Sequence, residues 1–306
     1  MKAYESNQVT TTLCLVMFLL TTVGSPIAFG DDAAGATQPA VQGGMKPPPS
    51  PMIAHVHLGG QVTETPVSDP FGFMGGQVTS LKRLIRTLRR GQDNDRVAAV
   101  IVTFGQVAMG LGQREEIRKA LMQIKRAGKP VYVFAEGMST ATYATFAVAS
   151  ELTMAPQTTV WLTGYYGETL YVKELLDKIG IGADFMQMEQ YKSAAEMFTR
   201  TGPSDPAREN YNWLFDSLYD TTVDMIAEAR GLSAERVQAL IDDGPYLADA
   251  ALEARLIDSV KPREQFIADV KMAVESKHGG AAWINNRYGD DVKPQLNFAN
   301  PFMIFS

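Results

Sequence analysis

Two apolar runs with a helix-like segment between them constrain the fold of this chain more than any other feature of its sequence. VAAVIVTF (97–104) and VYVFA (131–135) show no polar alternation, which is typical of strands buried on both faces of a sheet. Between them, apolar residues recur at helical spacing from Ile117 to Ile124, and Gly128 begins the turn that ends this pattern. Two buried strands joined through a helix predict parallel pairing with a crossover helix, and therefore an α/β fold.

The alternation of strands and helices continues along the chain. Further helices are expected over 139–149, 171–179 and 206–230, and further strands at LTMAP (152–156) and ADFMQME (183–189). Several polar residues are placed to act as N-caps of predicted helices: Thr79 or Ser80, Ser233 and Asp249. The residues of the longest helix that we expect to face inward are Leu214, Leu218, Met225, Ile226 and Ala229.

The chain divides into four parts by composition. Residues 1–30 contain the apolar stretch TLCLVMFLLTTV (12–23), which is shorter than the roughly 20 residues that span a bilayer, and end in the small-residue sequence Ala28-Phe29-Gly30. We interpret this part as an export signal cleaved near Gly30, with an uncleaved membrane anchor as the alternative. Residues 31–51 are predicted to be a disordered Pro/Gly-rich tether, 52–277 an α/β domain, and 278–306 an irregular tail that connects to or docks on another element. The domain is therefore expected outside the cytoplasm, either exported or anchored with the domain facing the periplasmic or extracellular side.

Charge and cysteine content exclude several classes of protein. The net charge of −6 argues against a nucleic-acid binder, and the single cysteine, Cys14, excludes an internal disulfide and a Cys-cluster metal site. His55 and His57 could be read as two metal ligands, but no third ligand cluster is evident, so we interpret them as strand side chains. No metal and no cofactor is expected.

A predicted helix that begins after Thr79 or Ser80 has a strongly basic face. Its apolar residues recur at helical spacing, and the remaining face carries Lys82, Arg83, Arg86, Arg89 and Arg90. A contact with phosphate or a lipid headgroup is one interpretation of this face. A solvated helix surface is the interpretation that we favour from the sequence.

Two segments combine hydroxyl and amine side chains with small residues. The strand VYVFA leads through Glu136-Gly137-Met138 into STATYATFAVAS, so that Ser139 and Thr140 stand at the start of a helix. About fifty residues later comes YKSAAEMFTR, in which Lys192 lies among small residues just before the turn TGPSDP. The sequence contains no HExxH motif, no recognisable Ser-His-Asp set and no phosphate-binding Gly loop at a strand–helix junction.

These segments give the chain its resemblance to a known family. It resembles the SppA signal peptide peptidases of the protease IV type, which are serine proteases with a Ser–Lys dyad. The similarity runs through MIAHVHLGGQVTETP, GKPVYVFAEGMSTATYATFAVASELTMAP, EQYKSAAEMFTRTGPSDPAREN and DDGPYLADAALEARLIDSV, in that order. The resemblance implies a Clp protease/crotonase type of fold, built of repeated ββα units with parallel sheets and flanking helices.

The resemblance also assigns roles to positions in this sequence. Lys192 matches the general base of the family, and the nucleophile position falls on Thr140, with Ser139 before it. The glycine-rich oxyanion stretch of the family is replaced here by FGQVAMG (104–110), and Arg255 stands where the family has glycine. The chain therefore looks like the N-terminal, lysine-bearing half of the tandem form, in which the second half donates the serine.

A lysine that acts as a general base must be neutral, which requires burial that lowers its pKa from about 10.4 by roughly three units. We therefore expect apolar neighbours around Lys192, supplied by Tyr191, Ala194, Ala195 and Phe198, and we expect Glu189 and Glu196 to point away. Threonine is a nucleophile chiefly where its own terminal amine is the base, so Ser139 and Thr140 are also explained as residues that cap a helix.

Two functions remain open from the sequence. The first is an exported SppA-like peptidase component that degrades signal peptides or other apolar peptides, with Lys192 as general base and the serine supplied by a second half or a partner. It would act in a ring-like homo- or hetero-oligomer near a membrane surface. The second is a catalytically inactive peptide-binding or scaffold subunit with the same fold. A third, remote interpretation, acyl-CoA chemistry on this fold, lacks the oxyanion glycines it would need.

Overall fold

The two apolar runs lie side by side in the centre of a parallel sheet. The computed structural model describes residues 50–65, 78–186 and 188–289, which all belong to one compact unit that begins at Pro48. Strand β3 (Val97–Ala108) pairs in parallel with β4 (Val131–Ala135), and helix α2 (Leu111–Arg126) connects them. The predicted α/β class and the predicted crossover are therefore confirmed.

Among the described residues the main sheet has seven strands in the order β10-β1-β3-β4-β6-β9, with β2 beside β1, and every pairing in it is parallel. The strands that join β3 and β4 in it are β1 (Met52–Thr63), β2 (Val78–Ser80), β6 (Glu151–Met154), β9 (Ser259–Val260) and β10 (Trp283–Asn285). A smaller sheet contains β5 (Met138–Ser139), β7 (Thr159–Trp161) and β8 (Tyr246–Leu247). Strand β10 comes from the segment that the sequence assigned to an irregular tail, and it pairs with β1.

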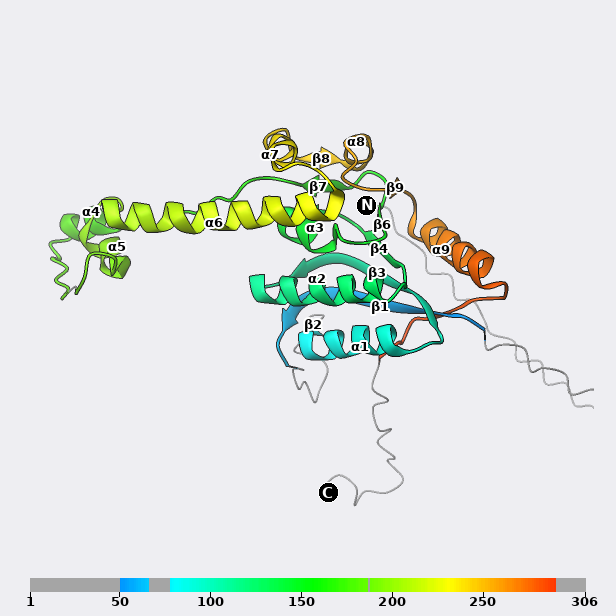
Figure 1. Ribbon diagram of the computed structural model, residues 1–306. Coiled ribbons are helices and arrows are strands. Elements are labelled where there is room, and N and C mark those ends of the chain that lie inside the picture. The colour runs from blue at the N-terminus through cyan, green and yellow to red at the C-terminus, as the bar shows by residue number, and fades with distance from the viewer. Residues whose placement is uncertain (1–49, 66–77, 187, 290–306) are drawn as a thin grey trace, which may run out of the picture. The chain divides into compact units, whose positions relative to one another are not determined.

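Helices cover both faces of the main sheet (Figure 1). One face packs against α1 (Leu81–Asp93), α2, α3 (Thr140–Phe146) and the last turns of α6 (Asp205–Arg230), whereas α9 (Arg263–His278) covers the other face. The shorter helices are α4 (Lys173–Lys178), the 3-10 helix η1 (Ser193–Ala195), α5 (Glu196–Thr199), α7 (Ala234–Asp242) and α8 (Ala248–Glu253). A long strand, a short strand and a helix follow one another in β1–β2–α1 and again in β4–β5–α3, which are the expected ββα units.

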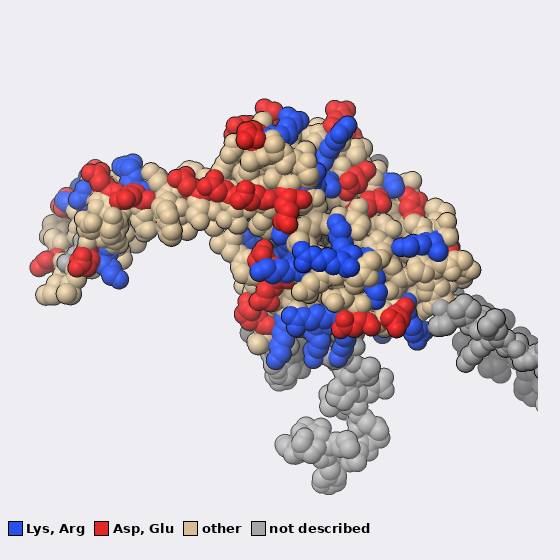
Figure 2. All heavy atoms as spheres, in the orientation of Figure 1, with Lys and Arg blue, Asp and Glu red and all other residues tan. Residues whose placement is uncertain are grey.

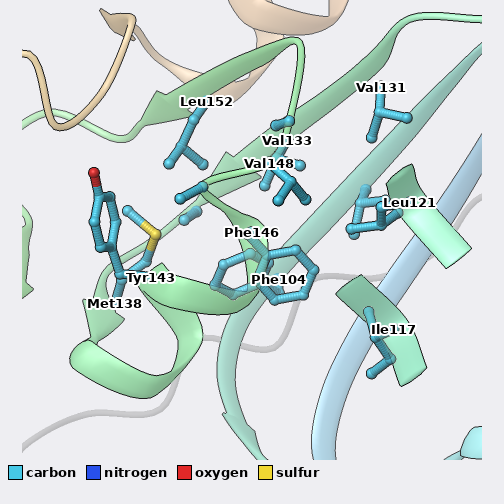
Figure 3. Packing of buried hydrophobic residues seen from close by; sticks show 14 of the residues in the cluster. Phe104, Ile117, Leu121, Val131, Val133, Met138, Tyr143, Phe146, Val148 and Leu152 are labelled. Carbon is cyan, nitrogen blue, oxygen red and sulfur yellow. The ribbon is translucent and has the colours of Figure 1, made fainter. Parts of the chain in front are cut away.

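Aromatic packing fixes α3 against the sheet. The rings of Phe104 on β3 and Phe146 on α3 stack with their centroids 4.3 Å apart, inside the cluster of apolar side chains that Figure 3 shows. Tyr143 is fully buried, and its hydroxyl donates a hydrogen bond to the carbonyl oxygen of Leu256 at 2.8 Å. Burial raises the pKa of Tyr143 to about 12, so this hydroxyl stays protonated and remains a donor. The start of α3 is thus held rigidly.

Most predicted helix ends are found, and three details of the sequence-based prediction are wrong. Ser80 and Ser233 are N-caps, as predicted, but Asp249 lies in the first turn of α8, whose N-cap position is Leu247. The described residues of 183–189 form no strand. Leu214, predicted to face inward, is 45% exposed, because only the last turns of α6 reach the core.

His55 and His57 are strand side chains on β1, and both meet the same hydroxyl group. His55 Nε2 lies 2.9 Å and His57 Nδ1 3.0 Å from Thr103 Oγ1 on the neighbouring strand β3. His55 Nδ1 lies 2.7 Å from Asn286 Oδ1, so the network also ties the segment after β10 to the sheet.

The predicted export signal (1–30), most of the predicted tether (31–51) and residues 290–306 of the tail lie outside the described residues. Within the part of the chain that the structure describes, none of the helices combines the length and the apolar character needed to span a bilayer.

Candidate active site

A cavity opens where the strands on one side of the molecule end. Its volume is about 500 Å³, within the size range of ligand-binding pockets. Its walls come from the carboxyl end of β3, from the link between β4 and α3, and from β7 with the loop before it. The lining residues are Gly105, Gln106, Val107, Glu136, Gly137, Met138, Ser139, Thr142, Gln157, Thr158, Thr159 and Trp161. Ligands in α/β proteins bind at the carboxyl ends of parallel strands, so this cavity is the first candidate for a substrate site.

Ser139 lines this cavity, and its hydroxyl caps α3. Ser139 Oγ accepts from the N–H of Thr142 at 3.3 Å, and the Ser139 N–H donates to Thr142 Oγ1 at 2.8 Å. This reciprocal pair is the capping-box arrangement that satisfies free amides at a helix start. Neither lysine nor histidine is among the residues that line the cavity, so no described residue there can take a proton from Ser139 as a basic amine or imidazole would.

Thr140, the predicted nucleophile position, is buried, and its hydroxyl is engaged with the backbone after β7. Thr140 Oγ1 lies 2.9 Å from the carbonyl oxygen of Trp161 and 2.8 Å from that of Thr163, and it accepts from the Thr163 N–H at 2.8 Å. Thr140 is also absent from the residues that line the cavity. This geometry explains the hydroxyl of Thr140 as a structural link between α3 and the chain after β7.

Three residues of FGQVAMG (104–110), the segment that the resemblance places at the oxyanion stretch, lie in the cavity wall: Gly105, Gln106 and Val107. A Cβ atom on Gly105 would stand 3.4 Å from Glu136 Oε2, so the carboxylate of Glu136 is directed at the end of β3. An oxyanion site needs hydrogen-bond donors, whereas an ionised carboxylate offers only acceptors. Gly137 has a φ of +128°, a conformation that favours glycine, and it sets the bend between β4 and β5.

Lys192 lies in an extended region of the chain that we call the arm (residues 164–186 and 188–217). Within these ranges only Glu196 and Ala207 are buried. Lys192 is exposed and lies just before η1. Its side chain makes no hydrogen bond or ion pair with another described residue. Tyr191, Ala194 and Phe198 are exposed as well, so the burial that we predicted around Lys192 is not found within this chain.

The arm is nevertheless held in a defined conformation. Glu196 accepts hydrogen bonds from the hydroxyl and the N–H of Ser204 at 2.5 and 2.9 Å, and Ser204 is the N-cap of α6. The N–H of Val172 donates to the Met197 carbonyl at 2.8 Å. Glu196 is thus directed at Ser204, which agrees with the expectation that it points away from Lys192.

The structure does not bring Lys192 together with Ser139 or Thr140. Helix α6 contacts α3 through its last turns, where Thr222 lies, and α5 packs at its opposite end near Ser204 (Figure 1). The 18 residues between Ser204 and Thr222 correspond to about 27 Å of helix. Within one copy of this chain, the predicted base and the predicted nucleophile position therefore belong to separate regions.

A second, apolar cavity lies at the junction of α2, α3 and α6. It has a volume of about 330 Å³ and is mainly apolar. Its lining residues are Leu111, Gly112, Arg114, Glu115, Ala141, Ala144, Thr145, Leu218, Thr221, Thr222 and Met225. An apolar group of a ligand would fit a space of this size and character.

Sequence reasoning missed Gln106, Glu136 and Trp161 as cavity residues. All three lie at or just beyond the carboxyl end of a strand, in β3, after β4 and in β7. For Gln106 and Glu136 the signal that could have found them is position, because the residues at the carboxyl ends of buried parallel strands meet at one edge of a sheet. Trp161, in a short strand of the smaller sheet, has no such signal.

Comparison with protein families gives a match to the model described as "Peptidase family S49" over residues 123–277, which is half of the chain. The match includes the start of α3, the whole arm and the helices after it. The chain belongs to peptidase family S49. The resemblance to the SppA-type proteases that the sequence motifs indicated is therefore confirmed.

Similar curated proteins have names from the same family. The chain is 28% identical over 220 residues to "Protease 4" of Salmonella typhi. This alignment covers 69% of this chain and 35% of that protein. It is 25% identical over 192 residues to "Serine protease SPPA, chloroplastic" of Arabidopsis thaliana, covering 63% of this chain and 28% of that protein. The chain thus spans about a third of the length of these two relatives.

Similar solved structures include a mutant of the "1510-N membrane-bound stomatin-specific protease" in complex with a substrate peptide. The TM-score is 0.44 at 12% identity, and the alignment covers 78% of this chain and 92% of that one.

Proposed function

We propose that this S49 protein is the lysine-bearing component of an exported serine peptidase that acts on signal peptides or other apolar peptides. The observation that carries the proposal is the placement of Lys192. It is exposed on the arm with no side-chain partner among the described residues, whereas the hydroxyl groups of Ser139 and Thr140 are already engaged within the chain. An amine presented in this way can reach a hydroxyl group on a second polypeptide.

The chemistry needs both groups. A serine hydroxyl becomes a strong nucleophile when a neutral amine takes its proton, and the serine oxygen then forms a bond to the carbonyl carbon of the peptide. The resulting ammonium gives the proton to the departing amine as the peptide C–N bond breaks, and water later releases the acyl group. In this scheme Lys192 is the proton acceptor and donor, and the second half or a partner chain supplies the serine and its oxyanion donors.

A partner also supplies the dry environment that the base requires. A general-base lysine has to be shielded from water, because water favours its charged form. In this chain Lys192 is exposed, so the shielding has to come from a second half or a partner that covers the arm. The arm is suited to being covered, because Tyr166, Leu170, Ile179, Met186, Met188 and Trp213 are each at least 60% exposed.

The resemblance supports the proposed substrate, and the composition of residues 1–30 supports the proposed location. An extended apolar peptide can add to the edge of a short strand and place a side chain in the apolar cavity beside α3. Residues 1–30 would direct the protein out of the cytoplasm, and the assembly would be a homo- or hetero-oligomer near a membrane.

The second candidate function is a catalytically inactive peptide-binding or scaffold subunit of the same fold. The position of Glu136 favours it, because a carboxylate beside Gly105 opposes negative charge where an oxyanion would form. In this case the cavity and the arm would bind peptide or partner, and Lys192 would take no part in chemistry.

A digestion assay separates these functions. Casein or a fluorogenic signal peptide is incubated with the chain alone, and with the chain plus an S49 polypeptide that carries an Ala-Ser-Gly-Gly-Tyr motif, to be sought in the same reading frame or a neighbouring one. We expect cleavage only in the mixture, and we expect Lys192→Met to lower its rate by about 10²- to 10⁴-fold, the usual range for loss of a general base.

Lys178→Met is the matched control, since Lys178 is another exposed arm lysine, at the end of α4. Cleavage by the chain alone would contradict the proposal that the serine comes from elsewhere. Peptide binding without cleavage in every mixture would support the inactive subunit.

A further inference from the structure

The cavity that Ser139 lines, at the carboxyl ends of β3 and β4, has charge of one sign only in its wall. Among the described residues that line it, Glu136 is charged and none is Lys, Arg or His. The side chain of Glu136 makes no hydrogen bond or ion pair with another described residue. On the face that Figure 2 shows, by contrast, Lys and Arg over α1 and α2 lie close to Asp and Glu. The cavity therefore presents an uncompensated carboxylate to a ligand.

The backbone on both sides of Glu136 is fixed by strand pairing. The N–H of Glu136 donates to the carbonyl oxygen of Phe104 on β3 at 3.2 Å, next to the last paired residue of β4. Two residues later, Met138 pairs with Val160 of β7 in the smaller sheet. Glu136 thus lies where the chain passes from one sheet to the other. A ligand that binds its carboxylate has to order only the side chain, which keeps the entropic cost of binding low.

The other exposed side chains of this cavity suit an organic cation. Gln106 and Gln157 make no side-chain hydrogen bond with another described residue, and each has an amide oxygen that can accept one. Trp161 is 59% exposed, and the face of an indole ring attracts guanidinium and ammonium groups. A metal ion fits less well, because Ca²⁺ and Mg²⁺ sites need several ligands and Glu136 is the one carboxylate among the described lining residues.

We propose that this cavity binds a basic side chain of a peptide, with Glu136 as the anionic partner and Trp161 as an aromatic wall. Arginine fits better than lysine, because its planar guanidinium can donate to both oxygens of a carboxylate and stack on an indole ring. The inference rests on the proposed function in that the ligand is a peptide, but not on the source of the serine. It narrows the apolar peptides of that function to those that carry a basic residue, as the start of a signal peptide does.

Peptide binding to the full chain, without a serine-bearing partner, tests this assignment. The probes are N-acetylated, C-amidated decapeptides of leucine, alanine and serine that carry a neutral fluorophore and differ in one central residue, which is arginine, glutamine or glutamate. Fluorescence anisotropy at about 0.15 M NaCl gives the dissociation constant of each peptide. We expect the arginine peptide to bind at least about tenfold more tightly than the glutamine peptide, and the glutamate peptide to bind most weakly.

Variants assign the preference to the cavity. Glu136→Gln removes the charge and keeps the shape of the side chain, so the preference for arginine over glutamine should fall below about twofold. Glu136→Lys should reverse the order, so that the glutamate peptide binds best, which a loss of folding would not produce. Trp161→Leu should weaken the arginine peptide about two- to fivefold more than the glutamine peptide. Glu264→Gln, at an exposed position on α9 across the sheet, makes the same change in net charge and should leave the preference intact.

Two results would overturn the proposal. One is an arginine peptide that binds no more tightly than the glutamine peptide, or that does not bind at millimolar concentration. The other is an equal loss of the preference in Glu136→Gln and Glu264→Gln, because the net negative charge of the chain, and not the cavity, would then attract the peptide. These measurements need no cleavage, so they can fail while the digestion assay succeeds, and the reverse.

Discussion

At the scale of single residues, the hydroxyl groups at the start of α3 show how local bonding decides what a side chain can do. The hydroxyl of Thr140 has one proton, which it can donate to the carbonyl of Trp161 or of Thr163, and it accepts from the Thr163 N–H. A nucleophile needs its hydroxyl proton directed at a base and its lone pair directed at the substrate. Thr140 has both directed at the backbone.

Substitution of Thr140 separates a structural role from a catalytic one. Thr140→Val removes the hydroxyl and leaves the Thr163 N–H without its partner, so we expect the free energy of unfolding to fall by about 1–3 kcal/mol in urea titration. Thr140→Ser keeps the hydroxyl and should cost less than about 1 kcal/mol for the lost methyl group. Unchanged stability of Thr140→Val, together with complete loss of cleavage in the assembled peptidase, would instead identify Thr140 as a nucleophile.

Arg255 stands where the resemblance implies a glycine, and the energetic cost of an arginine at this position can be measured. Its φ is +60°, in the left-handed region that glycine adopts without strain, and the S49 resemblance places a glycine at this position. We expect Arg255→Gly to raise the free energy of unfolding by about 0.5–1 kcal/mol. Arg255→Ala removes the same side chain but keeps the Cβ atom, so it should give no such gain. Equal stability of both variants would show that the side chain, and not the backbone conformation, determines the effect.

At the scale of elements, the junction of α5 and α6 explains why an arm with little core keeps its conformation. Burial by itself would raise the pKa of Glu196. The hydrogen bonds from the hydroxyl and the N–H of Ser204, together with the charge of Arg200, outweigh this effect, so the pKa is lowered from its ordinary 4.5. The ionised carboxylate therefore stabilises the first turn of α6. This stabilisation is present above pH 4.5 and is lost as the pH falls through the lowered pKa of the folded protein.

The effect of Glu196 can be followed by hydrogen exchange in the arm. At pH 7, Glu196→Gln should make the amides of the first turn of α6 exchange about fivefold faster, because a neutral amide replaces a charge-assisted hydrogen bond. The difference from the unmodified chain should shrink well below pH 4.5, where Glu196 is protonated too. If the difference in exchange rate between Glu196→Gln and the unmodified chain stays constant down to acid pH, the packing of the side chain and not its charge stabilises the junction.

Elements with local signals could be predicted from the sequence, and those without a core could not. The strands at 97–104 and 131–135 are apolar throughout, and Ser80 and Ser233 cap helices through bonds three residues away, so each signal lies within a few residues. In the arm, Phe185, Met186 and Leu214 have apolar side chains that predict burial, yet they are exposed in this chain. An apolar pattern indicates that a residue is suited to burial, but it does not indicate what buries it.

At the scale of the whole molecule, the described residues that line the cavity beside α3 include neither lysine nor histidine, and Lys192 lies on the arm, away from the hydroxyl groups of Ser139 and Thr140. The position of the cavity follows from the carboxyl ends of β3 and β4, which could be predicted from strand order. The distance between Lys192 and α3 depends on the direction of α6 and could not be predicted, because a helix of this length can fold back on the core or extend from it. The exposed apolar side chains of the arm give a second polypeptide an extensive surface to bind.

The most direct test of the account is whether Lys192 activates a serine on another polypeptide. The serine-bearing S49 partner is mixed with this chain and treated with a fluorophosphonate, which labels activated serines, and the labelled residue is located by mass spectrometry. The account predicts that the partner serine is labelled at least about 100-fold faster with the unmodified chain or Lys178→Met than with Lys192→Met. Equal labelling with Lys192→Met, or labelling of Ser139 or Thr140 in the chain alone, would contradict it.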